Sequence, residues 1–222
     1  MNTVDLNIIR DTPFIKLNID IDHELLLKEY KEVEKKYSFE NYRTRYWPVR
    51  KKYANAWSGI CLVSSKGELY SDMQEGNSSA SSETELKSIC PYYYDLISKL
   101  GGEGLRARIM RIAPKESLLW HSHVQEHGQP EWQLTCQIPI IMPEDFEYCV
   151  LHKDEFKWWK RFHRPNWLKN VWRKKFEVGK AYIFNSYHYH NVFNYTNEYR
   201  VTLMLYLDLR KNKVQKILKE SI

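Results

Sequence analysis

The chain has 222 residues, of which 43% are hydrophobic and 28% charged, with a formal net charge of +6. This balance is ordinary for a globular domain and excludes wholesale disorder, while the positive charge favours anionic partners without identifying one. No run of sequence approaches the roughly 20 apolar residues of a membrane helix, and the first eleven residues lack the pattern of a signal peptide. Four cysteines without a CxxC pair favour reduced thiols, so we expect a cytoplasmic protein with no membrane partner.

The N-terminal hundred residues mix strand and helix patterns. Apolar residues alternate over 14–19, which predicts a strand, and Asp22 can cap a helix that ends near Tyr37. The aromatic content of 14%, with sixteen Tyr and eight Trp, favours a β-rich fold. The other elements expected in this region are a buried strand at 57–63, a polar loop at 76–83, and helical pieces at 84–90 and 91–100 that stop at Gly101-Gly102.

From residue 105 onward, short strands follow one another with no long helix between them, which is typical of an antiparallel sandwich or barrel. We predict one domain over 1–222, with strand and helix support in 1–100, a β-barrel core in 101–210, and a C-terminal helix or tail in 211–222. The strands expected in the core are 105–112, 117–123, 131–141, 147–153, 181–185, 188–194 and 199–209.

Two segments carry histidines in a pattern that suits a metal. Side chains two apart on a strand point the same way, so His121 and His123 can both face a barrel interior. His190 follows about 70 residues later, and His188 shares its strand face. Imidazole suits iron, although a few partly buried histidines on a sheet would leave the same pattern.

Arg200 lies ten residues after His190. If the intervening chain forms a hairpin with its turn near 196–197, the two residues lie on neighbouring strands. A guanidinium a short distance from a metal offers a planar fork to the far carboxylate of a chelating ligand. These residues therefore make a workable oxygenase site.

The surrounding sequence supports that interpretation. Residues 108–123 read RIMRIAPKESLLWHSH, an apolar strand, a Pro-containing turn and a short strand before His-x-His, and residues 179–209 read GKAYIFNSYHYHNVFNYTNEYRVTLMLYLDL. Both blocks resemble signatures of the aspartyl/asparaginyl β-hydroxylase family of iron(II)/2-oxoglutarate oxygenases, which includes related proline hydroxylases. The likeness covers about 57–209. It implies a double-stranded β-helix (jelly-roll, cupin-like) barrel with flanking N-terminal helices, Fe(II) as cofactor and 2-oxoglutarate as cosubstrate.

The resemblance assigns roles residue by residue. His121 matches the first iron ligand, His190 the second histidine ligand, and Arg200 the partner of the 2-oxoglutarate C5 carboxylate. His123 takes the place of the family carboxylate, where it can bind iron as a third imidazole, hold a water or turn away. The family's Arg-x-His reads Thr-Cys-Gln here and ends at Gln137, which can donate an uncharged hydrogen bond to the cosubstrate. No catalytic residue beyond the iron ligands is predicted.

These features favour a hydroxylase that acts on an amino acid, free or within a peptide or protein. Two alternatives remain: a three-histidine iron dioxygenase without 2-oxoglutarate, and a non-catalytic jelly-roll module that binds an anionic partner. Residues 157–175 are basic and aromatic together, which suits either nucleic-acid binding or an insertion that covers the substrate. We favour the insertion, because the segment falls between the two metal-binding blocks.

Overall fold

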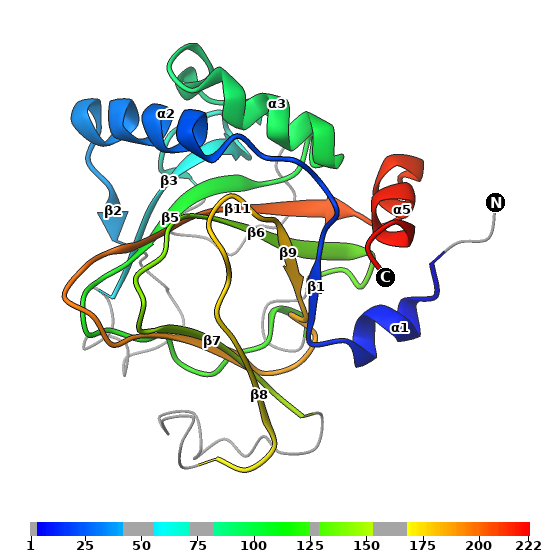
Figure 1. Ribbon diagram of the computed structural model, residues 1–222. Helices are drawn as coiled ribbons and strands as arrows, with labels where there is room; N and C mark the ends of the chain where they lie inside the picture. Colours follow the sequence, from blue (N-terminus) through cyan, green and yellow to red (C-terminus); the bar gives the residue numbers. More distant parts are fainter. Residues whose placement is uncertain (1–3, 42–55, 72–81, 125–128, 153–167) are drawn as a thin grey trace.

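The computed structural model describes residues 4–41, 56–71, 82–124, 129–152 and 168–222, which fold into two antiparallel sheets (Figure 1). The strands are β1 (Phe14–Lys16), β2 (Glu40–Asn41), β3 (Trp57–Ser64), β4 (Ser82–Glu83), β5 (Ala107–Ile112), β6 (Gln133–Ile141), β7 (Phe146–Leu151), β8 (Val171–Lys174), β9 (Tyr182–Phe184), β10 (His190–Asn194) and β11 (Arg200–Asp208). The larger sheet has the order β1-β9-β6-β11-β5-β3-β2, with β4 paired to β3, and the smaller has the order β10-β7-β8.

The helices lie against the larger sheet, with α2 and α3 on the face opposite the smaller sheet (Figure 1). Asp22 caps α2 by accepting a hydrogen bond from the Leu25 N–H, as the sequence predicts. α3 has Pro at its first turn and ends at Gly101, whose φ of 83° is left-handed and suits glycine. The helices are α1 (Leu6–Asp11), α2 (His23–Lys36), a 3₁₀ turn (Glu85–Ser88), α3 (Pro91–Leu100) and α5 (Asn212–Lys219).

β11 is the central strand of the larger sheet and pairs with both β5 and β6. All nine of its residues are buried. Because successive side chains of a strand point to opposite faces of the sheet, they face alternately the main core and the space between the two sheets. Val201, Leu203 and Leu205 belong to the main core, which includes buried residues of α2 and α3. Arg200 and Met204 point to the other side, into a pocket between the sheets. The strand that builds the core therefore also builds one wall of the pocket.

The predicted pairing of the last two long strands is wrong. β10 pairs with β7 in the smaller sheet, whereas β11 lies in the larger one. The chain therefore crosses between sheets after Asn194, and His190 and Arg200 face each other from different sheets. Both strands are fully buried, so the partner of each is decided by its packing on either face and not by the short link between them.

Other predictions differ from the structure in detail. The strand expected at 117–123 is reduced to two isolated bridges, Ser117 with Phe193 and His121 with His190. The helix expected at 84–90 is a 3₁₀ turn, and α1 and β8 were not predicted. Most of the expected loop at 76–83 lies outside the described residues, and its last two residues form β4. That 1–222 forms one domain stays a prediction.

Candidate functional site

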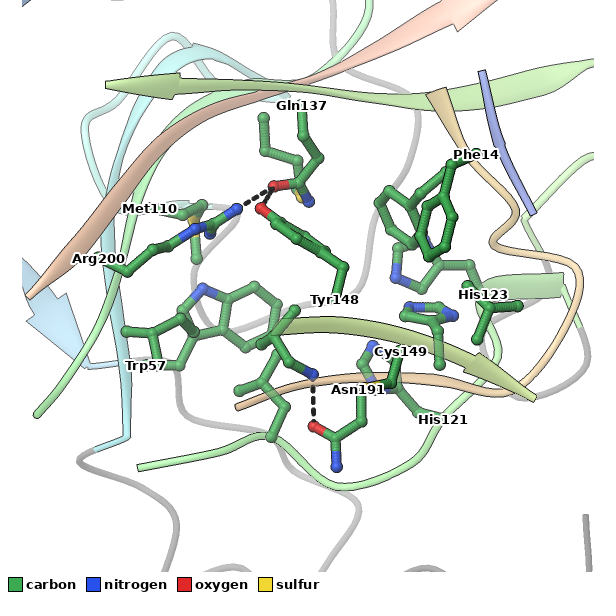
Figure 2. Close-up of a pocket in the computed structure, with 17 residues that line it drawn as sticks. Phe14, Trp57, Met110, His121, His123, Gln137, Tyr148, Cys149, Asn191 and Arg200 are labelled. Atoms are coloured by element: carbon green, nitrogen blue, oxygen red, sulfur yellow. Dashed lines mark hydrogen bonds between the residues drawn. The ribbon is translucent and has the colours of Figure 1, made fainter. Parts of the chain in front are cut away.

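A pocket of about 500 Å³, part of it open to solvent, lies between the two sheets (Figure 2). The larger sheet contributes one wall, and the smaller sheet with the segment before β6 contributes the other. Most of the lining is apolar, as is usual for a ligand site. The structure brings all of the sequence-predicted site residues into this one pocket: His121, His123, His190, Gln137 and Arg200.

The three histidines form a buried cluster in which one ligand-capable atom of each lies within 4.8 Å of the others. His121 and His190 are held side by side by a pair of backbone hydrogen bonds, 3.1 and 2.9 Å long. The backbone N–H of His123 donates to the Ser186 carbonyl at 3.1 Å, which brings its ring to the same place. Strand periodicity predicted that the His121 and His123 side chains point the same way. In the structure they do so without a regular strand, through the isolated bridge between His121 and His190 and the hydrogen bond from His123 to Ser186.

Hydrogen bonds to backbone carbonyls orient two of the rings. The Nδ1 of His121 lies 2.7 Å from the Leu119 carbonyl, and the Nδ1 of His190 lies 3.0 Å from the His188 carbonyl. A carbonyl only accepts, so each Nδ1 carries the proton and donates. Each Nε2 is therefore the unprotonated ring nitrogen, which is the tautomer that metal-binding histidines use.

The same logic applies to His123. Its Nδ1 lies 3.0 Å from Gln129 Oε1 and 3.2 Å from Thr135 Oγ1. Because the Gln129 amide nitrogen donates to the Gln133 carbonyl, the Gln129 oxygen must be the atom that faces the ring. The His123 Nδ1 is thus a donor, and its Nε2 is available as a third imidazole ligand. Sequence reasoning did not predict that Gln129 or Thr135 contacts His123, because local patterns do not show which distant side chains meet.

Arg200 lies across the pocket from the histidines and is only 3% exposed. Its Nη2 donates to Gln137 Oε1 at 2.6 Å, while its buried Nε finds no acceptor among the described residues. The rings of Phe146 and Tyr148 lie 5.1 and 4.9 Å from the guanidinium carbon. Burial lowers the pKa of Arg200 well below its ordinary value. An anionic ligand would supply the charge partner that this guanidinium lacks in the described part of the chain.

Tyr148 is a pocket residue that the sequence did not reveal. Its hydroxyl donates to Gln137 Oε1 at 2.9 Å, and its ring stacks on Phe176 with centroids 3.9 Å apart. It faces the pocket because β7 pairs with β10, in the register that places it opposite Val192. That pairing is a long-range choice with no local sequence signal.

The remaining sequence candidates lie away from the histidine cluster or outside the description. The Nε2 of His188 lies 3.0 Å from the Arg10 carbonyl, so this ring is engaged elsewhere. Of the basic segment 157–175, residues 157–167 lie outside the described residues, and Val171–Lys174 forms β8, an edge strand of the smaller sheet. All four cysteines are buried, and none of them forms a disulfide bond. No helix in the described part of the chain is both long and apolar enough to cross a lipid bilayer.

Several solved structures have a similar fold. An oxidoreductase of the 2OG-Fe(II) oxygenase family from Burkholderia pseudomallei has a TM-score of 0.55 at 11% identity, over 92% of this chain and 89% of its own. HygX from Streptomyces hygroscopicus, solved with nickel and 2-oxoglutarate, has a TM-score of 0.55 at 9% identity, over 93% and 86%. A prolyl hydroxylase from Trichoplax adhaerens, solved with a peptide of hypoxia inducible factor, gives 0.53 at 10% identity, over 91% and 87%. The predicted mainly β, jelly-roll fold class is confirmed.

A comparison with models of protein families identifies the family of this chain. The aspartyl/asparaginyl beta-hydroxylase family model matches residues 21–210, so the chain belongs to the aspartyl/asparaginyl β-hydroxylase family of iron(II)/2-oxoglutarate oxygenases. The resemblance read from the two sequence blocks is thereby confirmed, and the protein is an enzyme of this family. No curated protein matches the chain in sequence.

Proposed function

We propose that this enzyme hydroxylates an amino acid, free or within a peptide or protein, with Fe(II) held by His121, His123 and His190 and with 2-oxoglutarate as cosubstrate. One observation carries the proposal. Three buried imidazoles, with one ring nitrogen of each within 4.8 Å of the others, face across one pocket a buried guanidinium that has no acidic partner among the described residues. A metal and a dicarboxylate together complete both ends of such a pocket.

The donor set fits iron. Three neutral imidazoles leave the full charge of the metal in place, whereas a family carboxylate at the position of His123 would cancel part of it. That retained charge favours an anionic chelating ligand beside the metal. The hydrogen bonds to the Nδ1 atoms hold the rings before any metal arrives, so little ordering is left for binding.

The far end of the pocket fits the distal carboxylate of 2-oxoglutarate. Arg200 presents a planar fork in a buried setting, where a charge-assisted hydrogen bond is stronger than in water. Apolar side chains, among them Ile112, Val192 and Met204, line the pocket, and a bound ligand would bury itself against them. When bound, iron and 2-oxoglutarate supply the oxidation, while the chain supplies position and a dry site.

A three-histidine iron dioxygenase without 2-oxoglutarate is the second candidate. The observation that favours it is the third imidazole, because His123 stands where a carboxylate would otherwise be. Arg200 would then be structural or bind the substrate itself. The two candidates differ in whether 2-oxoglutarate binds next to the metal.

The test is an anaerobic titration of the purified protein with Fe(II) and then with 2-oxoglutarate, followed by the visible charge-transfer band of the chelate. We expect the band in the wild type, its loss in His190→Ala, and a need for far more 2-oxoglutarate in Arg200→Ala. His188→Ala is the matched control, since it removes a nearby imidazole that lies outside the cluster, and its band should match the wild type. Iron binding without a band would favour the second candidate. Absence of iron binding would reject both candidate mechanisms.

A further inference from the structure

We propose that the Gln137 side chain occupies the place of the cosubstrate's distal carboxylate, and that Arg200 and Tyr148 are the two donors which that carboxylate takes over. The inference rests on the proposed function, because it describes how the same site receives 2-oxoglutarate. Figure 2 shows the three side chains meeting at one point of the pocket, across the view from His121 and His123.

The first argument is the hydrogen bonding of one oxygen. Gln137 Oε1 accepts from Arg200 Nη2 at 2.6 Å and from the Tyr148 hydroxyl at 2.9 Å. A guanidinium only donates, so the amide must present its oxygen and not its nitrogen to this point. Two donors that converge on one buried oxygen hold it as they would hold an oxygen of a carboxylate. In this arrangement Gln137 is an acceptor, whereas donation to a cosubstrate would require it to turn.

The second argument is the guanidinium edge. Nε and Nη2 of an arginine lie on the same edge of the planar group, which a carboxylate can bind with both oxygens. In Arg200 the Nη2 of that edge holds Gln137, while Nε has no partner among the described residues. The neutral amide oxygen thus satisfies half of a two-pronged site. A carboxylate in its place satisfies both prongs and supplies the missing negative charge.

The third argument is the fixed position of Tyr148. Its ring is 2% exposed, stacks on Phe176 and lies 4.9 Å from the guanidinium carbon of Arg200. These contacts involve the ring and not the hydroxyl, so they hold Tyr148 in place whether or not Gln137 is there. Tyr148 is therefore preorganised as the second donor to the incoming carboxylate.

The arrangement has an energetic consequence. A carboxylate makes stronger hydrogen bonds to these donors than a neutral amide does, but it must displace the Gln137 oxygen from both. Gln137 therefore competes with the cosubstrate and raises the 2-oxoglutarate concentration at which the site fills. If Gln137 were instead a donor to the cosubstrate, its loss would weaken binding. The two roles predict opposite signs for the same substitution.

The experiment measures ligand dissociation constants by calorimetry on the full chain loaded anaerobically with Fe(II). The ligands are 2-oxoglutarate and 2-oxopentanoate, which has the same chain length and no distal carboxylate. For 2-oxoglutarate, Gln137→Met should bind about fivefold more tightly, because the internal acceptor is gone. Gln137→Glu should bind at least about tenfold more weakly, since its carboxylate pairs with Arg200 permanently. Tyr148→Phe should bind about tenfold more weakly to 2-oxoglutarate and unchanged to 2-oxopentanoate.

The matched control is Tyr182→Phe. Tyr182 stacks on Phe176 with centroids 4.1 Å apart, and its hydroxyl bonds Glu177 and not the pocket residues. Both ligands should bind this variant as they bind the wild type. Should Tyr148→Phe fail to fold, the opposite signs of the two Gln137 variants still decide the matter. A wild type that binds no 2-oxoglutarate would contradict the proposed function. A wild type that binds it, with Gln137→Met unchanged or weaker, would overturn this inference and leave the function standing.

Discussion

The two ends of the pocket are built in opposite ways. At the histidine end, each Nδ1 already has its acceptor, and one ring nitrogen of each histidine lies within 4.8 Å of the others. At the arginine end, one buried oxygen of Gln137 is shared by two donors, and Arg200 Nε is left without a partner in the described chain. The first end is complete except for a metal. The second is held together by an acceptor that a ligand can replace.

This difference indicates how each end responds to its ligand. A preorganised set of imidazoles binds a metal without rearrangement, so its affinity depends on the ligands and their hydrogen-bond partners. The arginine end binds by exchange, so its affinity depends on what the ligand must displace. Substitutions at the two ends should therefore affect metal and cosubstrate separately, and the following variants test that separation.

The largest effect is expected at the third imidazole. His123→Ala removes one of three converging donors, so Fe(II) affinity should fall by at least about a hundredfold, beyond the loss usual for an outer-shell partner. His123→Asp restores the family's carboxylate position and should retain most of that affinity. A competition assay with a coloured chelator measures both. An unchanged affinity in His123→Ala would show that the ring is not a ligand.

The next largest effect is expected from Arg200, whose replacement should weaken cosubstrate binding but stabilise the ligand-free protein. Arg200→Met should weaken 2-oxoglutarate binding by about a hundredfold, because the distal carboxylate loses its charged partner. The same change should stabilise the ligand-free protein by about 1–3 kcal/mol, since it replaces a buried charge by an apolar side chain. Calorimetry and chemical unfolding measure the two quantities. Loss of stability would mean that the ligand-free protein already compensates the guanidinium charge.

A smaller effect is expected from the support of His123. Gln129→Leu removes the closer acceptor of its Nδ1 and should lower Fe(II) affinity by about tenfold, while 2-oxoglutarate affinity of the metal-loaded protein stays near that of the wild type. Thr135→Val removes the more distant contact and should cost less. Equal losses of metal and cosubstrate affinity in either variant would contradict the idea that the two ends of the pocket bind their ligands independently.

The smallest effect concerns a thiol on the pocket wall. Burial raises the pKa of Cys149 to about 12, so at pH 8 only about one thiol in ten thousand is ionised. An alkylating reagent at pH 8 should therefore leave Cys149 unlabelled in the folded protein and label it after unfolding, as mass spectrometry of the peptides would report. Rapid labelling of the folded protein would show that this wall opens to solvent.

Much of this molecule follows from local patterns in its sequence. The cap at Asp22, the stop at Gly101 and the strand that forms β11 depend on neighbouring residues, and each was predicted. Two short blocks of sequence were enough to identify His121, His190 and Arg200 as site candidates. The same blocks predicted the family, which the family model confirms. Local chemistry decides these features, so a single sequence is enough to find them.

Tertiary structure decided the features that depend on distant partners. Only the sheet pairing shows that His190 and Arg200 face each other from different sheets, because two buried strands choose partners by packing along their whole length. The position of Tyr148 follows from the same pairing. The orientation of His123 depends on Gln129 and Thr135, through hydrogen bonds that form only when those segments meet. The sequence gives the types of the site residues. Their distances and directions within the pocket depend on long-range contacts that form only in the folded chain.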